Sequence, residues 1–424
     1  MSGAESRLAA AELLHLTIDK RRTLDEAMTL SDTYNALEGP DRGFARAIAS
    51  AALRHLGWID QTVQPFLSRP LAATGVEIRA LIRAGAAQIW FLDVAPHAAV
   101  NATVDAARLS RGSRSGGSFL NAALRRVSEA PPPATVLAPE SIWPAWLGDA
   151  LTASLGTDGA RALAEAQRAE PALHLTAAGS PADLAAVTGG RLLASGSVEA
   201  PGGAVEDLPG YAEGQWWVQD QAAALPAKLL NAAPGDTVLD LCAAPGGKTL
   251  QLAATGAQVT ALDRSAPRLD RLRENLARTG LTADVVVADA EAWGPDQKFE
   301  KILLDAPCSA LGTLRRHPEG AWIKAAADVA RFPGVQARLL DAAAGLLAPG
   351  GTLIYCVCSP IASEGRDVVN AALAAGTLVR RPIDPAECPG FEDCVTPDGD
   401  VQTLPGPSRD CDAFYIARLA AAPA

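Results

Sequence analysis

The chain has 424 residues, of which 49% are hydrophobic and 20% charged, and its formal net charge is −11. This length exceeds what one ordinary hydrophobic core needs, so we expect two or three globular domains. The negative charge excludes general adhesion to nucleic acid, although residues 1–130 carry 15 basic against 13 acidic side chains and the acidic excess therefore lies entirely in the rest of the chain.

The sequence also argues against a secreted or membrane protein. No apolar segment follows a basic start, as it would in a signal peptide, and no uncharged apolar run is long enough for a membrane-spanning helix. The seven cysteines, an odd number without a paired Cys-x-x-Cys, fit neither a disulfide framework nor a zinc site. We therefore expect a cytoplasmic protein that holds no metal.

Apolar residues at steps of three and four predict that residues 1–130 are helical. The longest such pattern runs from Phe44 to Phe66, with Gly57 as a potential break, and shorter ones cover residues 8–18, 78–89, 100–109 and 119–127. Between the last two helices lies a Gly/Ser-rich loop with three arginines, Arg108, Arg111 and Arg114. These arginines are either solvated or in contact with phosphate, and the sequence favours neither.

The next hundred residues have a weaker pattern. Pro131-Pro-Pro-Ala-Thr reads as a linker, and a polar, Ala-rich helix is expected over residues 159–169. Short apolar runs in a Gly/Pro-rich region then predict a small α+β connecting domain. Its adjacent Trp216 and Trp217 are more often core residues than a platform for stacking bases.

Strand and helix patterns alternate from residue 235 to residue 420, which predicts a parallel sheet covered on both faces. Strands are expected at residues 237–241, 258–262, 284–288, 301–304 and 352–357, with a final pair near 378–382 and 413–419. Helices are expected at about residues 249–254, 267–279 and 333–347.

Reactive side chains follow two of these strands. Asp305 and Cys308 end the strand at 301–304, and Cys358 ends the strand at 352–357. Because the carboxyl ends of parallel strands meet at one edge, these groups are expected to lie together where ligands gather. Cys356 shares a face with Cys358 but lies within its strand, so we interpret it as a core residue, and we interpret Cys388, Cys394 and Cys411 as core or surface residues.

A cofactor site is expected after the earlier strands. Val238 to Thr249 reads as a strand, a turn of small residues and a helix start, and the next two strands end in Asp263 and Asp289. These acids could accept ribose hydroxyls and an adenine amino group, although each alone could be an ordinary strand-end cap. Because G-x-G-x-x-G and G-x-x-x-x-G-K-[ST] are both missing, S-adenosylmethionine is favoured over a diphosphate ligand.

The helical region resembles the RNA-binding fold of the NusB antitermination factor. The likeness is carried by His97-Ala-Ala-Val-Asn-Ala-Thr-Val-Asp-Ala-Ala and by Ser118-Phe-Leu-Asn-Ala-Ala-Leu-Arg-Arg. It covers most of residues 5–130. Because this fold serves many proteins, it implies little about chemistry by itself.

Three further motifs resemble the RNA cytosine-5 methyltransferases of the Sun/Fmu type: Asp240-Leu-Cys-Ala-Ala-Pro-Gly-Gly-Lys-Thr, Leu304-Asp-Ala-Pro-Cys-Ser and Tyr355-Cys-Val-Cys-Ser. The resemblance implies an all-α NusB-like domain at 1–130, a linker and small α+β domain at 131–231, and an α/β Rossmann-like S-adenosylmethionine-dependent methyltransferase domain at 232–424. With the NusB-like domain in front, it implies methylation of C5 of a cytidine in 16S ribosomal RNA.

The resemblance also implies roles for single residues. Cys358 would add to C6 of cytosine, which makes C5 nucleophilic, Cys308 would help to release the product, and Asp305 would lie between the cytosine and the sulfonium end of the cofactor. The residues that would hold S-adenosylmethionine are Cys242, Ala243, Ala244, Pro245, Gly246, Gly247, Lys248, Asp263, Asp289 and Asp305. Arg315 and Arg316 match the family's run after the Pro-Cys motif and would hold RNA phosphate.

The chain departs from the family pattern at three points. Val357 replaces the usual threonine before the nucleophile, Ala413 replaces a glycine, and the connecting domain has Leu173-His-Leu-Thr176 where Leu-Arg-Val-Asn is usual. The first removes a hydroxyl beside Cys358, and the last puts the RNA contacts of the connecting domain in question.

Alternatives stay open. In DNA cytosine methyltransferases the cysteine after proline attacks the base, which would make Cys308 the nucleophile. Other functions for the whole chain are a methyltransferase of tRNA or another RNA, a non-catalytic RNA-binding or ribosome-assembly factor, and a nicotinamide oxidoreductase, which the missing glycine pattern disfavours.

Overall fold

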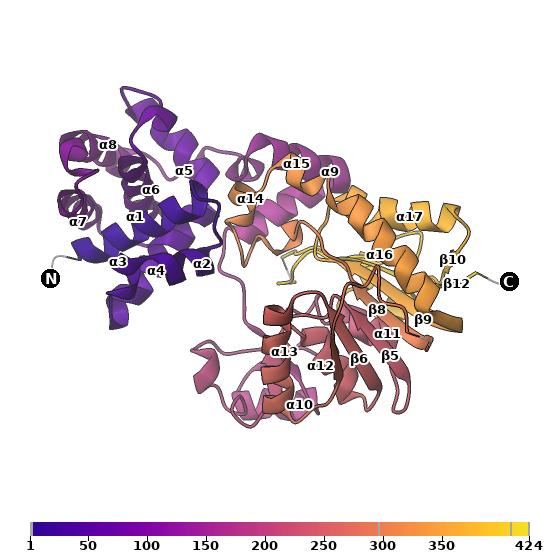
Figure 1. The fold of residues 1–424 in the computed structure, drawn as a ribbon. Helices are drawn as coiled ribbons and strands as arrows, with labels where there is room; N and C mark the ends of the chain where they lie inside the picture. Colours follow the sequence, from indigo (N-terminus) through magenta and orange to yellow (C-terminus); the bar gives the residue numbers. More distant parts are fainter. Residues whose placement is uncertain (1–2, 296, 408, 423–424) are drawn as a thin grey trace. The chain divides into compact units, whose positions relative to one another are not determined.

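The structure is a computed structural model that describes residues 3–295, 297–407 and 409–422. It divides into two compact units (Figure 1). Residues up to Ala169 together with Leu314–Ala326 form the first unit, and Glu170–Thr313 together with the residues from Ala327 onward form the second. The division at Ala169 falls inside the range 131–231 that we predict as linker and connecting domain.

The first unit is helical, and its helices before residue 130 share one core. Its main helices are α1 (Ala4–Ile18), α4 (Gly39–Arg54), α6 (Val76–Phe91), α7 (Pro96–Leu109) and α8 (Gly117–Glu129). They bury mostly Ala, Leu and Ile side chains, and α1 packs against α4, α6 and α7. The four shorter helices predicted from periodicity are thus confirmed.

The long helix predicted from Phe44 to Phe66 is two helices. His55, with φ −115° and ψ 20°, separates α4 from α5 (Leu56–Val63). Gly57 is not the break. A Cβ at Gly57 would lie 2.5 Å from the carbonyl oxygen of Ser141, so the glycine allows a neighbouring segment to pass close to the helix.

Two short helices follow α1 and were not predicted, α2 (Leu24–Leu30) and α3 (Asp32–Asn35). Their starts are fixed by side-chain caps: the Thr23 hydroxyl accepts the backbone N–H of Glu26, and the Ser31 hydroxyl accepts that of Tyr34. Such caps satisfy N–H groups that a helix start leaves unbonded.

A segment of the later chain completes the first unit. Leu314–Ala326, which includes α14 (Gly320–Ile323), lies within the range predicted for the methyltransferase domain but belongs to this unit. Arg54 Nη1 donates to the Arg315 carbonyl at 2.8 Å and also to the carbonyls of Gln167 and Ala169, just beyond α9 (Ala145–Gln167). The backbone N–H of Leu24 donates to the buried Glu319 carboxylate at 3.4 Å.

The second unit begins with the predicted small α+β region. Four short strands, β1 (His174–Ala177), β2 (Arg191–Leu192), β3 (Val198–Glu199) and β4 (Trp216–Val218), form a sheet in the order β2-β3-β1-β4, with α10 (Pro181–Thr188) beside it. Trp216 and Trp217 are buried, which confirms the core position that we favour for them.

The larger sheet has the order β10-β12-β9-β8-β5-β6-β7, and β11 pairs with β12. The strands from β5 to β9 are parallel, whereas β12 and β10 run antiparallel at one side. The bounds are β5 (Thr237–Leu241), β6 (Gln258–Asp263), β7 (Asp284–Val287), β8 (Phe299–Asp305), β9 (Leu347–Val357), β10 (Leu378–Arg380), β11 (Val401–Gln402) and β12 (Tyr415–Ala421). Each predicted strand is present; β11 was not predicted.

Helices cover both faces of this sheet, which confirms the predicted α/β architecture (Figure 1). α16 (Phe332–Leu346) and α17 (Arg366–Ala374) pack on the face of Leu304 and Tyr355, and α11 (Leu225–Leu230) packs on the face of Leu303 and Ile354. α12 (Gly247–Ala254) and α13 (Ala266–Thr279) cover that second face toward β6, and the short α15 (Ala326–Val329) precedes α16. Among the described helices, none combines the length and apolar character that crossing a membrane requires.

Candidate active site

The strand order reverses at β5. From β5 the chain proceeds to β6 and β7 on one side, and later to β8 and β9 on the other. Ligands of open α/β sheets bind at such a point, beyond the carboxyl ends of the strands. A cavity of about 320 Å³ lies there, and we call it the strand-end cavity. It is lined by Cys242, Ala244, Leu262, Asp263, Arg264, Arg268, Ala288, Asp289, Ala290, Glu291, Asp305, Ala306, Pro307, Cys308, Ala310, Val335, Leu339 and Cys358.

The two thiols predicted to react lie together in this cavity. The Sγ atoms of Cys308 and Cys358 are 3.4 Å apart, and both residues are partly exposed. The hydrogen bond to Cys358, together with burial, raises the pKa of Cys308 well above its ordinary value. Cys308 is therefore a neutral thiol near pH 7 that can donate a hydrogen bond to the sulfur of Cys358.

Asp305 lies beside the thiols and is held by two neighbours. Lys248 Nζ forms an ion pair with its Oδ2 at 2.7 Å, and the Cys356 thiol donates to its Oδ1 at 3.5 Å. Although burial opposes the lysine's charge, Asp305 raises the pKa of Lys248 above its ordinary value. Burial and Asp305 raise the pKa of Cys356 well above its ordinary value, so Cys356 is a neutral core thiol.

The other end of the cavity carries the two further carboxylates. Asp263 is buried, and it accepts the backbone N–H groups of Ala244 at 3.2 Å and Ser265 at 2.9 Å. Arg268 lies 3.6 Å from the same carboxylate. Asp289 is exposed after β7 and accepts the N–H of Glu291 at 3.0 Å. Both acids line the cavity, where a bound ligand could reach them.

The turn after β5 is shaped more by packing than by the cavity. Of its predicted cofactor residues, Cys242 and Ala244 line the cavity, whereas Ala243, Pro245, Gly246, Gly247 and Lys248 are not in its lining. Gly246 has φ +111°, and a Cβ there would lie 2.4 Å from Leu272 Cδ1 of α13. The close neighbour that makes glycine necessary at this position is thus a leucine of the protein.

Two groups at the start of the turn, the buried Asp240 and the partly exposed Cys242, have raised pKa values. Burial raises the pKa of Asp240 to about 7; Thr249 donates to its Oδ2 at 2.6 Å, and its Oδ1 has no hydrogen-bond partner among the described residues. Burial and the charges of Asp305 and Asp263 raise the pKa of Cys242 to about 12. Cys242 is therefore an unreactive thiol although it lines the cavity.

The loops that carry the thiols are tied together by their backbones, which the sequence did not reveal. The N–H of Gly312 donates to the Cys358 carbonyl, and the Gly312 carbonyl accepts the N–H of Ala413, both at 3.0 Å. A Cβ at Gly312 would lie 1.9 Å from the Ala413 carbonyl oxygen. Only glycine allows this approach.

The predicted RNA-binding arginines fall in different surroundings. Arg108 and Arg114 share a polar hollow of about 530 Å³ in the first unit with Asn101, Ser118 and Asn121, among others. Arg108 is exposed and pairs with Asp105 at 2.5 Å, whereas Arg111 lies on a separate hollow with Glu12 and Glu77.

Arg315 and Arg316 differ in accessibility. Arg315 is only 3% exposed and Arg316 is half-buried. In this conformation the guanidinium of Arg315 does not offer the open surface that we predict for a phosphate contact. The sequence could not show this, because the burial follows from the place of Leu314–Ala326 in the first unit.

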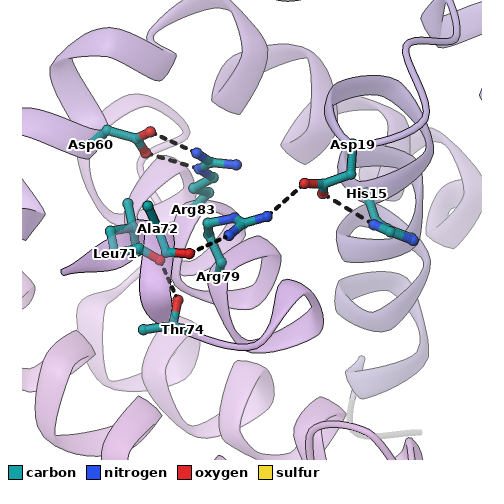
Figure 2. A network of polar contacts seen from close by, with 8 residues as sticks. All are labelled: His15, Asp19, Asp60, Leu71, Ala72, Thr74, Arg79 and Arg83. Carbon is teal, nitrogen blue, oxygen red and sulfur yellow. Dashed lines mark hydrogen bonds and ion pairs between the residues drawn. The ribbon is translucent and has the colours of Figure 1, made fainter. Parts of the chain in front are cut away.

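Other arginines of the first unit already have carboxylate partners (Figure 2). Arg83 of α6 binds Asp60 through two hydrogen bonds of 2.9 and 2.6 Å. Arg79, one turn earlier, donates to Asp19 at 2.6 Å and to the Ala72 carbonyl at 3.3 Å. Their charges are compensated within the protein, which makes them useful controls for Arg108 and Arg114.

Among the residues that the structure describes, no three or more His, Cys, Asp or Glu side chains are grouped so that they could hold a metal ion. The ionisable groups that line the strand-end cavity are thiols, carboxylates and the arginines Arg264 and Arg268, and Lys248 pairs with Asp305 from outside the lining. This set suits nucleophilic and acid–base chemistry on an organic substrate.

Comparison with known proteins places the chain in a family. A family model described as 16S rRNA methyltransferase RsmB/F matches residues 227–420, and the NusB family model matches residues 4–129. The ribosomal RNA small subunit methyltransferase B of Xanthomonas campestris pv. campestris is 36% identical over 440 residues, which cover 99% of this chain and 97% of that protein. The protein of the same name from Xylella fastidiosa (strain 9a5c) is 36% identical over 435 residues, covering 97% and 99%.

The fold is shared as well. The crystal structure of PH0851 superimposes with a TM-score of 0.75, covers 98% of each chain and is 22% identical in sequence. The NusB-like helical front and the methyltransferase domain, both predicted from motifs, are confirmed by these matches over almost the full length. The chain belongs to the 16S rRNA methyltransferase RsmB/F family.

Proposed function

We propose that this chain transfers a methyl group from S-adenosylmethionine to C5 of a cytidine in 16S ribosomal RNA, through a covalent bond between Cys358 and C6 of the base. The observation that carries the proposal is the pair of thiols 3.4 Å apart beside Asp305 in one cavity. The family's methyltransferase activity is in accord with it.

The other end of the strand-end cavity suits the cofactor. When bound, S-adenosylmethionine supplies an electrophilic methyl group on a sulfonium. Asp263 and Asp289 follow adjacent parallel strands, where carboxylates can accept ribose hydroxyls and an amino group. Asp305 ends β8, which lies in the sheet between β9, followed by Cys358, and β6, which ends in Asp263, so its negative charge would be close to the sulfonium.

Cys358 is assigned as the nucleophile. Its sulfur would form a bond to C6, and the electrons of the C5–C6 double bond would then make C5 nucleophilic toward the methyl group. Asp305, held by Lys248 at 2.7 Å, is placed to orient the base edge next to the thiols. For the alternative nucleophile, Cys308, the raised pKa is unfavourable because the neutral thiol predominates.

Cys308 is assigned to product release. After methylation a base, such as solvent water, must take the C5 proton; the electrons of the C5–H bond then re-form the C5–C6 double bond, and those of the C6–S bond return to the sulfur of Cys358. A neutral Cys308 thiol 3.4 Å away can donate a hydrogen bond to that leaving sulfur. This role explains why two thiols lie at one site.

The choice of RNA rests on the relatives and the front of the chain. The two relatives above are named as ribosomal RNA small subunit methyltransferases, which supports ribosomal RNA over tRNA as substrate. Arg108 and Arg114, which share one hollow, are the favoured phosphate contacts of the first unit, with Arg111 on a separate hollow. The half-buried Arg316 is a second candidate, whereas Arg315 is buried. Ribosomal RNA as the substrate would imply that this chain acts in the cytoplasm.

The test uses the purified full chain with methyl-labelled cofactor and 16S ribosomal RNA or tRNA. We expect label at C5 of a cytidine in 16S ribosomal RNA and none with the C358A variant. Label in tRNA alone would support the tRNA alternative, and binding of RNA without transfer would support the non-catalytic factor. Full activity of C358A would refute the assigned nucleophile.

A further inference from the structure

A buried carboxylate next to the thiols has no role in the chemistry described so far. Glu364 is fully buried in a short turn, Ala362–Glu364, that follows β9. Burying an ionisable group is unfavourable unless hydrogen bonds compensate. The donors to this carboxylate therefore indicate what it does.

Those donors are the two serines that directly follow the two reactive cysteines. Oε1 of Glu364 accepts the backbone N–H of Ser309 at 2.7 Å. Oε2 accepts the hydroxyls of both Ser309 and Ser359, which are 3.2 Å apart. One carboxylate thus joins the Cys308-Ser309 pair, after β8, to the Cys358-Ser359 pair, after β9.

The link lies where the sheet no longer connects the two loops. The last paired residues of β8 and β9 are Asp305 and Cys356. One further backbone hydrogen bond joins the two strands, from the Ala306 N–H to the Cys356 carbonyl at 3.0 Å. Beyond that point the two loops are joined by the Gly312 N–H, which donates to the Cys358 carbonyl at 3.0 Å, and by the bonds to Glu364. Ser309 and Ser359 directly follow the two cysteines, so along the chain each cysteine lies between residues paired in the sheet and a serine bound to Glu364.

The turn that carries Glu364 is itself anchored. The Tyr355 hydroxyl donates to the Glu364 carbonyl at 2.6 Å, and Tyr355 is fully buried within β9. The N–H of Glu364 donates to the Ile361 carbonyl at 3.0 Å. The carboxylate therefore has a fixed position from which to hold the serines.

We propose that Glu364 is a positioning residue that fixes the separation of Cys308 and Cys358, and through it the balance between formation and release of the covalent adduct. The part of this proposal that concerns the adduct rests on the proposed function. The part that concerns the distance between the thiols does not.

Two variants and one control separate this role from a general contribution to folding. E364Q keeps the volume and one acceptor for the Ser309 N–H but removes the second carboxylate oxygen. S359A removes the bond from Glu364 to the Cys358 loop, together with the contact of the Ser359 hydroxyl to that of Ser309 and the bond that it accepts from the Ile361 N–H. D400N changes another buried carboxylate of the same unit, which binds the Tyr415 hydroxyl and Arg380 and does not line the strand-end cavity.

The first measurement is oxidation of the folded full chain with diamide, followed by mass spectrometry of the peptides. Two thiols lose two electrons and two protons to the azo group of diamide, which becomes a hydrazine, and the Cys308–Cys358 disulfide forms. We expect wild type and D400N to form it at the same rate, and E364Q and S359A to be slower by about tenfold because the thiols lose their fixed approach. Unchanged rates in both E364Q and S359A would overturn the proposal.

The second measurement is the fraction of chain bound covalently to 16S ribosomal RNA during turnover, together with kcat and KM. We expect E364Q to change the adduct fraction and lower kcat with KM unchanged, and D400N to change neither. If wild type transferred no methyl group, the proposed function would fail, while the disulfide rates would still decide the role of Glu364. If E364Q transferred methyl groups with wild-type adduct fraction and rate, its positioning role would fail alone.

Discussion

Cys308 and Cys358 approach each other from opposite faces of the sheet. Cys308 packs against the core under α16 and α17, and Cys358 packs against the core under α11. Only beyond the ends of β8 and β9 can side chains from the two faces meet, because within a strand they are separated by the backbone. The two sulfurs are therefore close in space but different in surroundings, which allows them different roles.

At the residue scale, the first prediction concerns release. C308S keeps the nucleophile and replaces the thiol by a weaker acid, so the protein–RNA adduct should accumulate and turnover should fall by about 10²-fold. Denaturing gel electrophoresis with labelled RNA measures the adduct. C394S, which changes a buried cysteine outside the cavity, is the matched control. Normal turnover of C308S without adduct would remove Cys308 from the release step.

The second prediction concerns Asp240, whose pKa is raised by burial from 3.8 to about 7. Between those pH values the unfolded chain has lost a proton that the folded chain retains, so wild-type stability should fall as pH rises, by up to about 1.4 kcal/mol per pH unit. D240N has no such group. Its stability relative to wild type should therefore rise from about pH 4 to about pH 7 and stay constant above, as measured by urea unfolding. A difference independent of pH would contradict the buried, protonated state.

The sequence could predict which reactive side chains lie together where their positions depend only on the order and direction of the strands. Asp305, Cys308 and Cys358 meet in one cavity because parallel strands end at one edge, and that much follows from the sequence pattern. The direction of Lys248 toward Asp305 and the link through Glu364 were not predicted. They depend on the conformation of turns, which apolar periodicity does not encode.

At the element scale, the turn between β5 and α12 shows how packing restricts a loop. Gly246 combines φ +111° with a close approach of Leu272, whereas Gly280, after α13, has φ +67° and open space around it. Both positions disfavour an L side chain, but only the first adds a clash. Comparing substitutions at Gly280 and Gly246 therefore distinguishes the cost of backbone strain alone from the cost of strain combined with a steric clash.

The third prediction follows from this comparison. G280A should cost about 1 kcal/mol, from its positive φ alone. G246A should cost at least about 2–3 kcal/mol and should also weaken cofactor binding, because α13 must shift to accommodate the new methyl group. Urea unfolding and calorimetric titration with S-adenosylmethionine measure the two effects. Equal losses of stability in the two variants would contradict the role of Leu272.

Elements with strong periodicity were predicted, whereas several short ones, among them α2, α3 and β11, were not. The pattern from Phe44 to Phe66 was wrong only in its continuity, because His55 leaves the helical region without a proline or glycine to mark it. For α2 the sequence did contain a signal: Thr23 and Glu26 have the spacing of a capping box, and the structure contains both of its bonds. β11 has two residues and depends on pairing with β12, so nothing local specifies it.

At the scale of the whole molecule, the fourth prediction concerns RNA binding. Arg108 is exposed, and its pair with Asp105 is of a kind that contributes little, so it can exchange that partner for a phosphate. The double variant R108A/R114A should weaken binding to 16S ribosomal RNA and reduce the slope of log K against log salt by about 1–2. Filter binding at several salt concentrations gives that slope.

R79A is the control for this experiment, since it removes an arginine whose charge is compensated by Asp19 (Figure 2). Its salt slope should equal that of wild type, although its stability can be lower. A slope reduced equally by R79A and by R108A/R114A would show that the effect is one of net charge. An unchanged slope in R108A/R114A would exclude their hollow as a phosphate site.

The placement of Leu314–Ala326 in the first unit has a consequence for how the protein can be divided. The polypeptide passes between the units at residues 169–170, 313–314 and 326–327, so no single cut yields two complete units. A fragment that starts at Glu170 would expose Leu314 and Ala321, which are buried in the full chain. In such a fragment the segment between Thr313 and Ala327 would lose the unit in which it packs. The bonds that hold the loops of Cys308 and Cys358 to Gly312 and Glu364 lie within the second unit and would be kept.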